Sequence, residues 1–107
     1  MDEPRAFTKE ELRKDFLDHL RTLARYWAAS DHPMTKEELC SSVIFSVLCA
    51  IDGVACAVPY SLDLVCRPHP DDKQSCIDDG ENWVEDGMVI NDDGYLHDEW
   101  YGKKRGG

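Results

Sequence analysis

The chain has 107 residues, the size of one small domain, and a formal net charge of -10 at neutral pH. Acidic residues outnumber basic ones 22 to 12, which argues against direct binding to nucleic acid or to an anionic membrane. No apolar run is long enough to cross a membrane, and the N-terminus lacks the basic and apolar regions of a secretory signal. We therefore expect a cytoplasmic protein.

The five cysteines are predicted to be reduced thiols. Their number is odd, which does not suit a complete set of disulfides. Cys40, Cys49 and Cys56 lie in or beside an apolar stretch, so we expect these thiols to be buried in a reducing compartment.

Residues 8–28 are predicted to form an amphipathic helix. Thr8 with Glu11 has the spacing of a capping box, in which each residue satisfies an amide donor of the first turn. The helix should end before Pro33. Its apolar side chains recur at spacings of three and four and form one stripe: Leu12, Phe16, Leu20, Leu23 and Trp27.

Residues 35–52 are predicted to form a second helix, which is apolar over most of its surface. Thr35 with Glu38 repeats the capping-box spacing, and Gly53 is a suitable C-terminal glycine. The short connection between the two helices predicts an antiparallel hairpin. Because this helix is apolar on several sides, a homodimer in which a second copy covers part of its surface is a further possibility.

The rest of the chain is predicted to supply a small antiparallel sheet. Residues 60–66 alternate between apolar and polar, and three Asp-Gly turns at a seven-residue period suggest strands at 82–84 and 88–90. "LHDEWY" suggests a short C-terminal helix. The expected fold is α+β, with one domain at 1–102 and a flexible basic tail at 103–107. The expected core combines the helix stripes with the sheet: Leu12, Phe16, Leu20, Leu23, Trp27, Leu39, Val43, Val47, Ile51, Leu62, Leu64 and Trp83.

The stretch "PHPDD" contains residue types that hold catalytic zinc, since a histidine and a carboxylate can bind the ion beside a second, basic carboxylate. It resembles the His-Pro-Asp-Asp-Glu motif of zinc-dependent N-acetylglucosaminyl-lipid deacetylases. The resemblance implies His69 and Asp72 as metal ligands and Asp71 as base, although Lys73 stands where that family has glutamate. The alternative is a turn in which Asp71 or Asp72 caps a helical turn over 72–78.

Other metal sites are conceivable around this stretch. His97 is the only histidine after Lys73, so the alternative metal set is His69, Asp72 and His97. Cys66 and Cys76 with the same histidines would be a second zinc set, but no Cys-x2-Cys pair is present. The Asp-Gly turns could bind calcium weakly or simply face water. The sequence contains no convincing catalytic or cofactor motif, so we favour a protein without enzyme activity or cofactor.

Negative charge is concentrated in residues 71–99, which hold eleven acids and one base. Aromatic residues are interspersed there, and exposed aromatics beside charge are typical of protein interfaces. The expected partner is a basic protein surface. The residues predicted to bind it are Asp78, Asp79, Glu81, Glu85, Asp86, Asp92, Asp93, Trp100 and Tyr101.

Several segments together resemble a family of small bacterial and phage proteins that has no established activity. The resemblance is carried by "YWAASDHPMTKEELCSSVIFSVLCAIDG", "RPHPDD", "DGENW", "VIND" and "LHDEW". It implies a prokaryotic or phage-encoded protein in the cytoplasm of the bacterial host.

Two functions from different classes follow from these patterns. The leading hypothesis is an acidic protein-binding module, in a phage setting an inhibitor that imitates nucleic-acid phosphates on a basic surface of a host protein. The alternative is a metal-dependent hydrolase built on His69, Asp71, Asp72 and His97.

Overall fold

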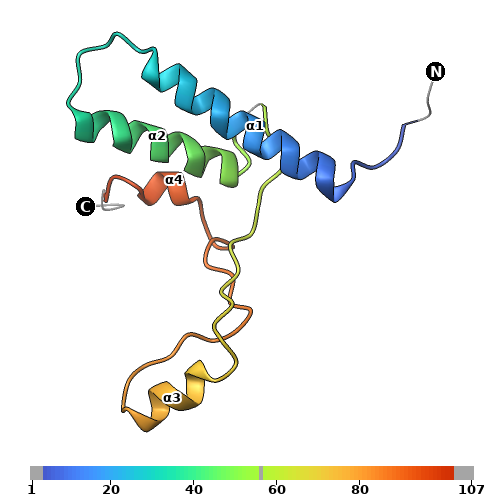
Figure 1. Ribbon diagram of the computed structural model, residues 1–107, viewed down its shortest axis with the longest axis vertical. Coiled ribbons are helices and arrows are strands. Elements are labelled where there is room, and N and C mark those ends of the chain that lie inside the picture. Colours follow the sequence, from blue (N-terminus) through green and yellow to red (C-terminus); the bar gives the residue numbers. More distant parts are fainter. Residues whose placement is uncertain (1–3, 56, 103–107) are drawn as a thin grey trace.

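The computed structural model describes residues 4–55 and 57–102. The residues in these two ranges form four helices: α1 (Lys9–Ala28), α2 (Lys36–Ile51), α3 (Asp72–Asp78) and α4 (Leu96–Glu99) (Figure 1). None of the helices in these ranges has the length and apolar character needed to cross a membrane.

Both long helices begin at the capping boxes expected from the sequence. The hydroxyl of Thr8 accepts from the Glu11 amide at 3.1 Å, and the Glu11 carboxylate accepts from the Thr8 amide at 2.8 Å. Thr35 and Glu38 repeat the arrangement at 3.0 and 2.7 Å. The two predicted helices are therefore confirmed. Each capping box was predictable because its two residues lie within one helical turn of each other.

The helices α1 and α2 form an antiparallel hairpin, and α4 packs alongside α2 (Figure 1). The indole N–H of Trp27 donates to the Ser46 hydroxyl at 3.0 Å and joins the two long helices. We call α1, α2 and α4 the helical lobe. The short α4 is the C-terminal helix expected from "LHDEWY".

Residues 63–93 leave the helical lobe as a narrow projection that ends in α3 (Figure 1). We call this segment the acidic arm. Its two limbs meet at one antiparallel bridge between Val65 and Val89. The Cys66 amide donates to the Met88 carbonyl at 2.8 Å, and the Ile90 amide donates to the Leu64 carbonyl at 3.0 Å. The arm is a two-limbed ribbon without a third strand to support it.

The predicted α+β fold with an antiparallel sheet is wrong. The structure is 48% helical with only 2% strand and no sheet in the described residues. Residues 82–84 form no strand, and 60–66 and 88–90 share only the single bridge. Gly80 and Gly87 adopt left-handed φ values of 71° and 84°, as Asp-Gly turns require, but the chain between them does not pair. A sheet stable in water needs at least three strands or a packed face, and this ribbon has neither.

The prediction of a well-buried core is also wrong. Ala50 and Val58 are the only fully buried apolar residues in the described ranges, and Trp83 is 41% exposed. The residues of the helix stripes are half-buried. The radius of gyration is 18.3 Å, whereas a compact chain of this length would have about 13 Å. The acidic arm points away from the helices, and neither of these two buried residues belongs to it (Figure 1).

The cysteine prediction is corrected in part. Cys40 is exposed rather than buried, and Cys49 is half-buried. Cys56 and the predicted tail at 103–107 lie outside the described residues.

Candidate functional site

The acidic arm carries most of the carboxylates predicted to bind a partner. Ten acids stand against two bases, Arg67 and Lys73, in residues 63–93. Arg67 lies 3.4 Å from Asp86, and Lys73 lies 3.9 Å from Glu85. Both ion pairs are exposed, so each contributes little free energy and can exchange for another partner. The exposed predicted acids are Asp78, Asp79, Glu81, Glu85, Asp86, Asp92 and Asp93.

Apolar side chains are exposed among these acids. Trp83 was expected in the core but is 41% exposed, with the Lys73 ammonium 5.3 Å from the centre of one of its rings. Val84 and Met88 are exposed by 54% and 50%. The arm therefore presents exposed apolar groups among exposed carboxylates.

Trp100 and Tyr101 do not lie on the arm. The Trp100 indole N–H donates to the Ser41 hydroxyl at 2.9 Å, which fastens the end of α4 to α2. The Tyr101 ring lies 5.4 Å from the Phe45 ring. The residues predicted to bind a partner thus fall in two places, the acidic arm and the helical lobe.

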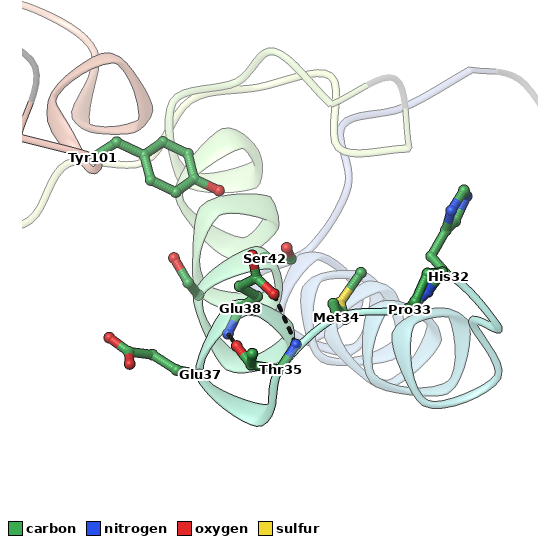
Figure 2. Close-up of a pocket in the computed structure, with 9 residues that line it drawn as sticks. His32, Pro33, Met34, Thr35, Glu37, Glu38, Ser42 and Tyr101 are labelled. Atoms are coloured by element: carbon green, nitrogen blue, oxygen red, sulfur yellow. Dashed lines mark hydrogen bonds between the residues drawn. The ribbon is translucent and has the colours of Figure 1, made fainter.

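Tyr101 borders a pocket of about 520 Å³ at the start of α2. Figure 2 shows Tyr101 on one side of this pocket and His32 on the other, with the Thr35–Glu38 capping bonds in the floor. The carboxylate of Glu38 is engaged in the cap, while Glu37 is exposed.

The "PHPDD" stretch forms a turn into α3, as the structural alternative predicted. The Asp71 amide donates to Nδ1 of His69 at 3.2 Å, and the Asp72 carboxylate accepts from the His69 amide at 3.1 Å. Asp71 is the N-cap residue of α3 by position but makes no side-chain capping bond. These contacts order the turn around the start of α3.

The alternative metal ligands are not brought together. His97 belongs to α4 in the helical lobe, whereas His69 precedes α3 at the far end of the arm (Figure 1). Within the described ranges no three His, Cys, Asp or Glu side chains are arranged to hold a metal ion. The geometry therefore gives no support to a hydrolase centred on His69, Asp71, Asp72 and His97.

The structure instead pairs His97 with Asp52, a residue that the sequence analysis did not single out. The buried Asp52 carboxylate accepts from the Leu96 and His97 amides at 3.1 and 2.9 Å. Nδ1 of His97 lies 2.6 Å from the same carboxylate. The only sequence feature at Asp52 was its place before the helix-ending Gly53.

Electrostatics favour a structural role for this pair. Burial raises the pKa of Asp52, but the hydrogen bonds from His97 and Leu96 outweigh burial and hold that pKa below its ordinary value.

Burial also raises the pKa of the nearby Cys49 thiol, and the negative charges of Asp52 and Asp98 raise it further. A thiol with a raised pKa stays protonated at neutral pH, which is the opposite of an activated nucleophile.

The base of the acidic arm is fixed by Asn91. Its side-chain amide donates to the Leu62 carbonyl at 2.7 Å, and its side-chain oxygen accepts from the Leu64 amide at 2.9 Å. A cavity of about 360 Å³ lies beside it, lined in part by Asp52, Asp63 and Asp92. Asn91 thus joins the two limbs at the base of the arm, and the Leu62 amide attaches this base to α2 by donating to the Ile51 carbonyl at 2.8 Å.

No family model matches the chain, and comparisons with curated proteins and with solved structures gave no significant match.

Proposed function

We propose that this chain is a protein-binding module whose acidic arm occupies a basic surface of a partner protein. The observation that carries the proposal is the projection of residues 63–93 away from the helical lobe with their carboxylates exposed (Figure 1). An element that adds so little to the core of its own chain is available to contact another molecule.

The charge of the arm defines the class of partner. Carboxylates spaced along a narrow ribbon attract cationic side chains, accelerate encounter and repel acidic surfaces. A protein groove that binds nucleic acid has the complementary charge and is shaped to admit an elongated polyanion. The arm would imitate phosphates through Asp78, Asp79, Glu81, Glu85 and Asp86, with Asp92 and Asp93 at its base.

The apolar part of the proposed surface is Trp83, Val84 and Met88, because these side chains are exposed on the arm itself. Apolar and aromatic groups within a charged frame supply affinity that salt does not remove. Trp100 and Tyr101 extend the surface only for a partner large enough to reach the helical lobe.

The bacterial setting of this proposal comes from the sequence resemblance alone. In that setting the module would act in the cytoplasm, and the partner would be a host nucleic-acid-binding protein such as a defence nuclease. The arm would inhibit it by covering the surface that receives nucleic acid.

Affinity capture from bacterial lysate at low salt tests the proposal with two matched variants. One variant reverses three arm acids, Asp78→Lys, Asp79→Lys and Glu81→Lys. The control reverses three exposed acids of the helical lobe and its loop, Glu10→Lys, Asp15→Lys and Asp31→Lys, with the same change in net charge. Circular dichroism checks that both variants fold.

The native chain and the control should capture the same basic proteins, and the arm variant should lose them. Equal capture by the arm variant and the native chain would overturn the proposal. Loss with both variants would show that only overall charge matters.

A further inference from the structure

An apolar groove lies where the acidic arm leaves the helical lobe. Its volume is about 450 Å³, and its apolar walls come from Leu12 and Phe16 of α1 and from Tyr60 and Leu62 at the base of the arm. The Tyr60 hydroxyl donates to the Leu12 carbonyl at 3.5 Å, which places the Tyr60 ring against α1. The groove is preformed by the joint that positions the arm.

Two cations, Lys9 and Arg13, line this groove one helical turn apart. Both are exposed, and neither pairs with a carboxylate in residues 4–55 and 57–102. The other cations near the start of α1 differ in this respect, because Arg5 pairs with Glu11 and Lys14 pairs with Asp18. The groove therefore suits an apolar segment flanked by carboxylates.

Residues 81–86, on the limb of the acidic arm that returns from α3, have that composition, and we call them the tip segment. Its sequence "ENWVED" places Trp83 and Val84 between Glu81 on one side and Glu85 and Asp86 on the other. Both apolar side chains are exposed, by 41% and 54%. The existing contacts of Glu85 and Asp86 are exposed ion pairs at 3.9 and 3.4 Å, which exchange at little cost.

We propose that the tip segment of one chain docks into the groove of a second copy. A chain's own tip segment lies beyond the Val65–Val89 bridge, whereas its groove lies before that bridge at the base of the arm, so the match is not made within one chain in this conformation. The groove lies at the base of the arm, and the tip segment lies in the outer part of the arm beyond the Val65–Val89 bridge. Two arms laid antiparallel therefore place each tip segment at the other's base and close a two-fold dimer.

The dimer would affect partner binding, because the tip segment that contacts the second copy includes Glu81, Trp83 and Val84, which also belong to the proposed partner surface. A basic partner and a second copy compete for the same tip segment. In the dimer the second copy covers this segment until a basic partner replaces that copy.

Sedimentation velocity of the full chain at increasing micromolar concentrations tests the dimer. The variant Lys9→Glu with Arg13→Glu should weaken dimerisation by about tenfold or more, because it replaces attraction at the rim with repulsion. The control Arg25→Glu with Lys36→Glu makes the same charge change at exposed cations outside the groove and should dimerise like the native chain. Adding Glu81→Lys and Glu85→Lys to the groove variant should restore the dimer.

Carbodiimide cross-linking of a mixture of ¹⁴N- and ¹⁵N-labelled chains locates the contact. Cross-links from Lys9 to Glu81 or Glu85 should join one labelled and one unlabelled peptide. A chain that stays monomeric throughout, a dimer unaffected by the groove variant, or the absence of these mixed cross-links would overturn the proposal. The groove variant keeps every arm acid, so it should still capture a basic partner, and the two proposals can fail separately.

Discussion

Asp52 at the end of α2 and His97 in the first turn of α4 are joined by a 2.6 Å contact between a carboxylate oxygen and Nδ1, across 45 residues of sequence. The same carboxylate accepts the amides of Leu96 and His97. The side chain of Asp52 therefore caps α4 from outside that helix. This contact holds the C-terminal segment against the lobe from which the acidic arm projects.

Replacing Asp52 with asparagine should release α4. Asn keeps the size of the side chain but presents one oxygen and a donor to a site that supplies only donors from the backbone. We expect a loss of about 2 kcal/mol in the free energy of unfolding, measured by urea denaturation. Amide hydrogen exchange at Leu96 and His97 should accelerate, while exchange in α1 stays slow. Unchanged exchange at these two amides would show that the contact does not hold α4.

The same contact should make stability depend on acid pH. The pKa of Asp52 is lowered in the folded state, so its contribution to stability is complete above the ordinary aspartate range, near pH 4. That contribution is lost as the pH falls through the lower, folded-state value. Unfolding of the native chain should therefore become easier below about pH 4 by more than unfolding of the Asp52→Asn variant does. Parallel pH profiles for the two proteins would contradict this prediction.

Gly53 should not tolerate alanine. Its φ is 79°, and an added Cβ would lie 2.9 Å from the Ser61 backbone nitrogen. Gly80 is the matched control, because its φ is 71° but an added Cβ would meet nothing within 4 Å. Both substitutions should cost about 1 kcal/mol for the left-handed backbone, and Gly53→Ala should cost more because of the contact. Equal losses in thermal or urea unfolding would show that the chain relaxes around Ser61.

Local elements of this fold could be predicted from the sequence, because their causes lie within a few residues. The capping boxes at Thr8 and Thr35 fixed the starts of α1 and α2, and the Asp-Gly pairs at Gly80 and Gly87 marked turns with left-handed glycines. The predicted sheet failed for a different reason. Alternating apolar residues show that a segment can be a strand, but not that partners are available to pair with it.

Only the amino-acid composition of the candidate site could be predicted from the sequence, not the arrangement of its residues in space. The concentration of acids was visible in the sequence, but their separation from Trp100 depends on the contact of that indole with Ser41, 59 residues away. The role of Asp52 depends in the same way on the approach of α4. Several segments that carry the family resemblance make contacts that hold the fold together. Asp52 of "AIDG" accepts the Leu96 amide of "LHDEW", and Asn91 of "VIND" donates to the Leu62 carbonyl at the base of the arm.

We propose that the acidic arm occupies a surface that otherwise receives nucleic acid. Competition measures this most directly: a captured partner is titrated with duplex DNA at constant ionic strength while its binding to the native chain is followed. DNA should displace the native chain, and the Asp78→Lys, Asp79→Lys, Glu81→Lys variant should not block DNA binding. A stable complex of partner, DNA and native chain together would show that the arm does not occupy the nucleic-acid surface.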